Sequence, residues 1–180
     1  VVNKKIADIR VVIVGAGAAG VAITRLLLAA GAQHIALLDT KGIIAVGREG
    51  MNPVKDALAQ QINPAGKRGS LAEAMVGADV FIGVSKPNVV TEDMVRSMAS
   101  GAIVFAMANP VPEIMPDLAT SAGAVVVATG RSDFPNQVNN VLVYPGLFRG
   151  LLDGRITKLT DTMRLAAAKA LAECVPNPTE

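Results

Sequence analysis

The sequence predicts an α/β fold with a doubly wound, mainly parallel sheet. Short apolar runs alternate with helical stretches along all 180 residues, which is typical of strands joined by crossover helices. Hydrophobic residues make up 51% of the chain, yet no apolar run approaches the roughly 20 residues that a membrane span needs. This combination fits strands that a parallel sheet buries on both faces.

The strands are expected where short runs of Val, Ile, Leu and Ala are bounded by Gly, Asp or Pro. They are predicted at 10–14, 34–38, 79–84, 102–107 and 124–128, with a shorter one at 141–143.

The helices are recognised by their starts. Asn52 and Pro53 supply a cap and a first-turn proline, and Ser70 with Glu73 forms a capping box. Thr91 is the cap of the next helix, followed at once by two acidic residues that suit a first turn. Helices are therefore predicted at 21–30, 54–61, 70–76, 92–99 and 159–174.

The most informative motif lies where the first strand ends. That strand runs into a G-x-G-x-x-G turn, a helix and a second strand follow, and Asp39 stands 19 positions after the last glycine. In this order the elements form a dinucleotide-binding fingerprint and indicate a Rossmann-type NAD(P)-binding domain. The residues predicted to hold the cofactor here are Gly15, Ala16, Gly17, Ala18, Ala19 and Gly20.

Each glycine of the turn has a separate expected role. Gly15 allows the tight turn, Gly17 leaves room for the pyrophosphate, and Gly20 lets the helix pack closely on the strand. The pyrophosphate would lie at the helix N-terminus, where free N–H groups favour an anion. A glycine-rich turn that binds no nucleotide, or one that binds FAD or another nucleoside cofactor, is the alternative.

Asp39 is expected to accept hydrogen bonds from the adenosine ribose and to repel a 2′-phosphate, which favours NAD over NADP. Lys41 and Arg48 follow closely and could weaken this preference. NADP is therefore not excluded.

Three further segments follow predicted strands and are expected at the same edge of the sheet, where ligands bind. They are 83–87, 108–110 and 129–131, all rich in Gly, Pro, Ser or Asn. Turn chemistry explains this composition equally well. We predict that Val84, Ser85 and Asn109 contact the cofactor.

Several sequence segments resemble those of a known family. They are Gly15–Gly20, Leu38–Gly42, Gly83–Pro87, Met107–Pro110, Thr129–Asn140 and Tyr144–Gly150. With these strings the chain resembles the NAD(P)-binding domain of malic enzymes, especially of the compact bacterial type.

The resemblance implies a part in oxidative decarboxylation of (S)-malate to pyruvate and CO₂, with hydride passed to NAD(P). It also implies that Asn109, Asn139 and Asn140 lie near the malate carboxylate, to which an amide NH₂ can donate. An Asn pair that holds a turn before a strand is the alternative for the last two. Malolactic and oxaloacetate-decarboxylating relatives need the same framework.

The family's lysine base, tyrosine acid and acidic ligands for Mg²⁺ or Mn²⁺ all lie N-terminal to its cofactor domain. We therefore expect neither a catalytic residue nor a metal ligand in this chain. Residues 1–175 are predicted to form the dinucleotide-binding domain and 176–180 a tail, with a substrate domain expected before residue 1. A free-standing module that senses NAD(H) is the alternative of another class.

Composition constrains location and partners. Cys174 is the single cysteine, and no basic stripe is present, so we expect a cytoplasmic protein without disulfides that binds neither nucleic acid nor membrane. Malate is the small-molecule partner expected from the resemblance. A face that is exposed around the loops and the last helix is expected to promote homo-oligomers.

Overall fold

A computed structural model describes residues 2–176 and 178. The described chain divides into two compact units, one of residues 2–138 and one from residue 139 onward. Each unit is described by itself. The expected domain of 1–175 stays a prediction, and part of the predicted tail (177, 179 and 180) lies outside the described residues.

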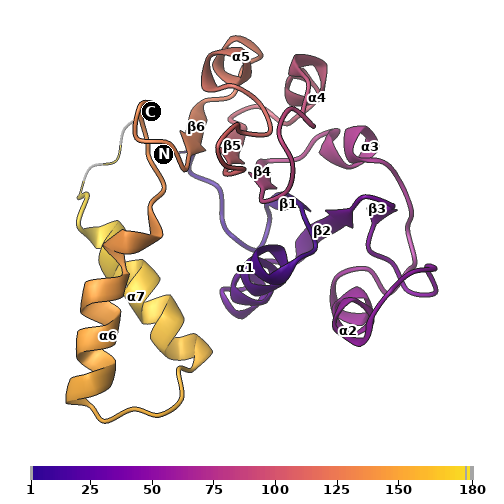
Figure 1. Ribbon diagram of the computed structural model, residues 1–180. Helices are drawn as coiled ribbons and strands as arrows, with labels where there is room; N and C mark the ends of the chain where they lie inside the picture. Colours follow the sequence, from indigo (N-terminus) through magenta and orange to yellow (C-terminus); the bar gives the residue numbers. More distant parts are fainter. Residues whose placement is uncertain (1, 177, 179–180) are drawn as a thin grey trace. The chain divides into compact units, whose positions relative to one another are not determined.

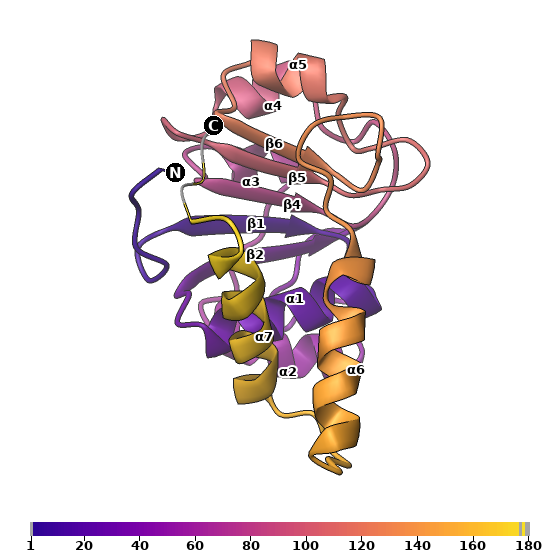
Figure 2. The same ribbon diagram turned by 90° about the vertical axis from the view of Figure 1, so that its left-hand side faces the viewer.

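The unit 2–138 is built on a six-stranded sheet with the order β3-β2-β1-β4-β5-β6. Its strands are β1 (Arg10–Val14), β2 (His34–Asp39), β3 (Gly42–Ile43), β4 (Val80–Gly83), β5 (Ile103–Ala106) and β6 (Val126–Thr129). All neighbours pair in parallel except the short β3, which runs antiparallel to β2. In Figure 2 the arrows of β1, β4, β5 and β6 point the same way. This arrangement confirms the predicted doubly wound sheet.

Helices cover both faces of this sheet (Figure 1). On one face lie α1 (Ala18–Ala29) and α2 (Pro53–Ile62), and on the other lie α3 (Leu71–Met75), α4 (Glu92–Arg96) and α5 (Pro116–Ser121). Because side chains alternate along a strand, β1 divides its residues between the two layers. Val11 and Ile13 pack into the layer of α1 and α2, and Val12 and Val14 pack into the other.

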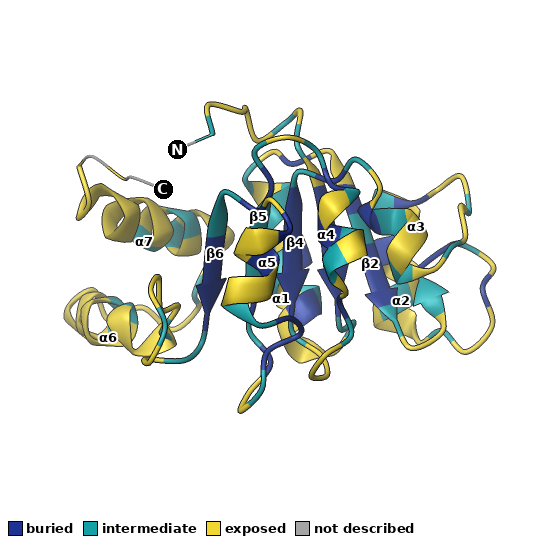
Figure 3. Cartoon of the chain, turned by 90° about the horizontal axis from the view of Figure 1, so that it is seen from above, coloured by how far each residue is buried: buried dark blue, intermediate teal, exposed yellow. Residues whose placement is uncertain are grey.

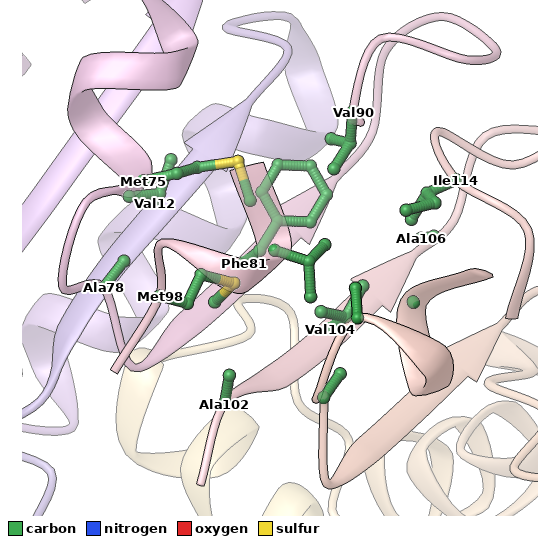
Figure 4. Close-up of a cluster of buried hydrophobic side chains, with 14 of the residues drawn as sticks. Val12, Met75, Ala78, Phe81, Val90, Met98, Ala102, Val104, Ala106 and Ile114 are labelled. Atoms are coloured by element: carbon green, nitrogen blue, oxygen red, sulfur yellow. The ribbon is translucent and has the colours of Figure 1, made fainter. Parts of the chain in front are cut away.

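Phe81 of β4 lies at the centre of the second layer (Figure 4). It is fully buried in one cluster with Met75, Met98 and Val104. Burying one such side chain contributes about 1.5–3 kcal/mol. The cluster holds β4 and β5 in place, and both strands end at the ligand edge of the sheet.

The predicted helix starts are confirmed by their caps. Asn52 Oδ1 accepts from the N–H of Lys55 at 2.9 Å, and Ser70 and Glu73 form both bonds of the capping box. The hydroxyl of Thr91 accepts from the first turn of α4. Helix α5 was missed because it has only 6 residues and no side-chain cap.

The second unit is a pair of helices, α6 (Tyr144–Asp153) and α7 (Asp161–Glu173), preceded by a short 3₁₀ helix (Asn140–Leu142). The strand predicted at 141–143 is therefore wrong. Asn139 accepts a hydrogen bond from the N–H of Val141 at 3.0 Å, and this local bond turns the chain into a 3₁₀ helix. The predicted last helix is confirmed as α7.

Many apolar side chains of the second unit are exposed, as the yellow ribbon of α6 and α7 shows in Figure 3. Phe148 is 58% and Leu152 75% exposed. A pocket of about 520 Å³ between α6 and α7 is lined mainly by Leu, Ala and Gly. Large exposed apolar surfaces mark sites of association. Within the described residues, no helix is long and apolar enough to cross a membrane.

Candidate cofactor-binding site

The turn between β1 and α1 is shaped by two glycines that have no room for a side chain. Gly15 has φ +111°, and a Cβ on it would lie closer than 3.0 Å to the carbonyl oxygen of Val84. A Cβ on Gly20 would also lie closer than 3.0 Å to the carbonyl oxygen of Gly15. The turn therefore closes tightly against the segment that follows β4 and against its own helix.

Gly17 differs from both, because a Cβ there would meet nothing within 4 Å. It is the N-cap of α1, and no side chain caps this helix. The free N–H groups and the positive end of a 12-residue helix thus face open space. Such a helix start favours an anion such as pyrophosphate.

This open space is a pocket of about 900 Å³. Gly15, Ala16, Gly17, Asp39 and Ser85 of the predicted site line it. Three lysines also line it, namely Lys41, Lys55 and Lys86. The space and its lining therefore fit an anionic ligand of dinucleotide size.

The other five predicted cofactor residues lie outside the pocket lining. Ala18, Ala19 and Gly20 form the first turn of α1. The backbone of Val84, the residue that follows β4, lies against Gly15. Asn109 is exposed and follows β5. None of these five belongs to the residues that line the pocket.

Asp39, the last residue of β2, binds two cations. Arg48 donates to both carboxylate oxygens, at 2.7 and 2.6 Å, and Lys55 Nζ donates to Oδ2 at 2.6 Å. The hydrogen bonds from Arg48 are the main reason that the pKa of Asp39 lies far below its usual range. Burial acts in the opposite direction, and the hydrogen bonds from Lys55 and from the N–H of Lys41 lower the pKa further. In turn, Asp39 raises the pKa of Arg48.

Sequence reasoning placed Arg48 near Asp39 but missed Lys55. Lys55 lies 16 positions after Asp39, in the first turn of α2. A positive charge near the N-terminus of a helix is unfavourable, because that end of the helix dipole is positive. The position of Lys55 in the sequence was therefore the one indication that an acidic partner stabilises it.

Glu113 is a second residue that sequence reasoning missed. It is fully buried. Its Oε1 accepts from the N–H of Ser85 and its Oε2 from the N–H of Ala108, both at 2.9 Å. The carboxyl group thus joins the segment after β4 to the segment after β5. A Cβ on Gly83 would collide with it, so glycine is required there.

The segment after β6 joins the same network. Arg131 pairs with Asp133 at 2.6 Å and donates to the carbonyl oxygen of Pro110 at 3.3 Å. Its guanidinium also lies over the ring of Phe134, 5.1 Å from the centroid. The three predicted segments at the carboxyl ends of the strands are therefore connected by side-chain hydrogen bonds.

The predicted substrate residues belong to different units. Asn109 lies in the unit 2–138, and Asn139 and Asn140 lie in the other. The side-chain oxygen Oδ1 of Asn139 caps the 3₁₀ helix, which leaves its NH₂ group outside that bond. Their common role near malate stays a prediction. Among the described residues, no group of three or more His, Cys, Asp or Glu side chains could hold a metal ion.

The strand order, the glycine turn and the pocket define the class of protein: a Rossmann-type dinucleotide-binding domain. Comparison with known families then identifies the family. The family described as malic enzyme, NAD binding domain, matches residues 1–180. The chain belongs to this family.

Named relatives agree with this assignment. The chain is 55% identical to a bifunctional malic/malolactic enzyme of Bacillus subtilis, covering 96% of the chain and 42% of that protein. It is 51% identical to an NAD-dependent malic enzyme of Geobacillus stearothermophilus (97% and 36% covered) and 46% identical to an NADP-dependent malic enzyme of Halomonas elongata (99% and 42% covered). The chain thus spans less than half the length of these relatives.

A solved structure extends the agreement to the fold. Malic enzyme from Pyrococcus horikoshii superposes with a TM-score of 0.94 at 43% identity, covering 100% of this chain and 44% of that one. The predicted family and fold are confirmed.

Proposed function

We propose that the pocket at the β1–α1 turn holds NAD(P) for an enzyme that oxidises (S)-malate and decarboxylates it to pyruvate and CO₂. One observation carries the proposal: the glycine turn that precedes α1 and the end of β2 line a single pocket of about 900 Å³, and Gly17 has no protein atom on its open side. The family of the chain and the names of its relatives support it.

In this proposal the pyrophosphate binds the N–H groups at the start of α1, beside Gly15 and Gly17. The adenosine ribose lies toward Asp39, and the nicotinamide lies toward Val84 and Ser85 beyond β4. The nicotinamide supplies a hydride acceptor for the malate C2 hydrogen. Glu113 holds the N–H groups of Ser85 and Ala108 still, so that this end of the pocket keeps its shape.

We further propose that Asn109, Asn139 and Asn140 donate amide N–H groups to the malate carboxylate. The general base, the general acid and the ligands of Mg²⁺ or Mn²⁺ would come from a part of the enzyme outside this chain. Malate turnover by the purified chain alone would contradict this division of roles. The malolactic name of one relative makes conversion of malate to lactate the second reaction to assay in the complete enzyme.

The exposed apolar residues of α6 and α7 support the proposal that another surface covers this face in the complete enzyme. We propose that the remainder of the polypeptide or a second copy covers it, and that the enzyme is a cytoplasmic homo-oligomer. Light scattering of the chain across a wide range of concentration tests this, and a strict monomer at every concentration would contradict it.

Cofactor binding is best tested at Gly17, where an added methyl group meets no protein atom but enters the proposed pyrophosphate space. Calorimetric titration with NAD⁺ should show binding to the chain and at least a tenfold loss, roughly 1.4 kcal/mol, in Gly17→Ala. The melting temperature should not change. Gly146→Ala is the matched control, because its added methyl group also meets nothing within 4 Å. Equal NAD⁺ affinity in the wild type, Gly17→Ala and Gly146→Ala would refute the proposed site.

A further inference from the structure

Glu113 carries a buried negative charge that no cation of the described chain neutralises. The residue is fully buried, and each carboxyl oxygen accepts one N–H, from Ser85 and from Ala108, which is the pattern of an ionised carboxylate. Both donors are neutral backbone groups, and none of the ion pairs between described residues includes Glu113. Buried charges are paired as a rule, because burying an isolated charge is costly. Glu113 is an exception to this rule.

The main chain fixes this charge in place. The carbonyl oxygen of Glu113 accepts from the N–H of Val90 at 3.1 Å, and that of Pro112 accepts from the N–H of Asn88 at 3.1 Å. The carboxyl group itself lies over Gly83, where an added Cβ would collide with it. The carboxylate is therefore held at the carboxyl ends of β4 and β5.

The charge lies directly behind the wall of the pocket. Ser85, whose N–H binds the carboxylate, is one of the residues that line the pocket. The proposed site places the nicotinamide ring toward this segment, since ligands of such sheets bind beyond the carboxyl ends of the strands. Lys86 also lines the pocket but is exposed, so that water and salt screen its charge more than that of a buried group. The buried carboxylate acts on this end of the pocket with little screening.

The two redox forms of the cofactor differ in charge at the nicotinamide ring. The ring is a pyridinium cation in NAD⁺ and is neutral in NADH, whereas the rest of the molecule is the same. A fixed anion near the ring therefore stabilises the oxidised form and has little effect on the reduced form. Two unit charges about 10 Å apart, at an effective dielectric constant of about 20, attract strongly enough to change a binding constant by more than about tenfold.

From this geometry we infer that Glu113 shifts the preference of the site toward the oxidised cofactor. The carboxylate attracts the pyridinium ring of NAD⁺ from behind Ser85, without touching it, and gives NADH no such attraction. The inference rests on the proposed function and names a specificity residue of that site. Its consequence is that the domain favours binding of the form that accepts a hydride and release of the form that has received it.

The test is calorimetric titration of the 180-residue chain with NAD⁺ and NADH, in the wild type and in Glu113→Gln. The substitution keeps the size of the side chain and removes its charge. The Kd for NAD⁺ should rise by a factor at least about fivefold larger than the Kd for NADH. A residue that only held the backbone in shape would change both constants by the same factor.

Two controls separate the charge from the shape of the site, with folding of each variant checked by circular dichroism. Gly83→Ala keeps the carboxylate but forces it to shift, because the added Cβ would collide with it. Both redox forms should then bind more weakly, and the ratio of their Kd values should stay within about twofold of the wild-type ratio. Glu49→Gln removes the same charge from an exposed position, where water screens it, and should leave both Kd values within about twofold.

A neutral analogue tests the charge without a change in the protein, and decides the inference where Glu113→Gln does not fold. In benzamide adenine dinucleotide an uncharged ring replaces the pyridinium ring of NAD⁺. It should bind the wild-type chain at least about fivefold more weakly than NAD⁺ does. Equal binding of these two compounds, or an equal effect of Glu113→Gln on NAD⁺ and NADH, overturns the inference and leaves the proposed function standing. Failure of all three compounds to bind overturns both.

Discussion

Glu113 offers the sharpest test of how the ligand edge of the sheet is held. It is fully buried, and each of its carboxyl oxygens accepts one backbone N–H, from Ser85 and from Ala108, at 2.9 Å. Glu113→Gln keeps the shape of the side chain but replaces one acceptor with an NH₂ donor. One of the two N–H groups must then face another donor.

The magnitude follows from these two bonds. A buried N–H without a partner costs about 1–3 kcal/mol, and the second bond loses the extra strength of an acidic acceptor. We expect Glu113→Gln to lower the free energy of unfolding by about 2–4 kcal/mol. For a domain of this size each kcal/mol corresponds to about 2–4 °C in Tm, so the Tm should fall by roughly 5–15 °C.

The assay is thermal and urea unfolding followed by circular dichroism, together with NAD⁺ titration well below the Tm. Glu49→Gln is the matched control, because Glu49 is exposed, and such changes stay within about 0.5 kcal/mol. NAD⁺ affinity should also fall in Glu113→Gln, since Ser85 lines the pocket, and should be unchanged in the control. A Tm within about 1 °C of the wild type would refute the role assigned to the carboxyl group.

Three further predictions concern the turn, the charge cluster and the helix that carries Lys55. Gly20→Ala should destabilise by about 1–3 kcal/mol or more in chemical unfolding, because its Cβ would collide with the Gly15 carbonyl oxygen; wild-type stability would disprove the contact. Because the pKa of Asp39 is lowered in the folded protein, the folded state binds fewer protons than the unfolded state. Asp39 therefore stabilises the fold above its pKa in the unfolded chain, about 3.9, and this stabilisation is lost as the pH falls below that value. The free energy of unfolding, measured with urea between pH 6 and pH 3, should therefore fall less steeply with decreasing pH in Asp39→Asn than in the wild type. An equal slope in the two proteins would contradict this. Asn52→Ala removes the cap of α2 and should cost about 0.5–2 kcal/mol in the same assay, with no effect expected if the cap is not formed in solution.

The sequence by itself determined the elements whose cause is local. Strand β1, the glycine turn and α1 follow from an apolar run, from glycines at fixed spacing and from helical periodicity. The starts of α2 and α3 follow from caps within three residues of their donors. The strand predicted at 141–143 was wrong because a single side chain, Asn139, bonds two residues ahead and outweighs a short apolar pattern.

Only the tertiary structure determined which charged and polar groups around the pocket bind one another. Lys55 meets Asp39 from 16 positions away, and Glu113 meets Ser85 from 28 positions away. Such pairs depend on the packing of α2 on the sheet and on the order of β4 and β5, and no local pattern encodes either. A motif predicts which groups surround a ligand because backbone geometry is local, but the fold decides which of those groups remain free because charges pair through space.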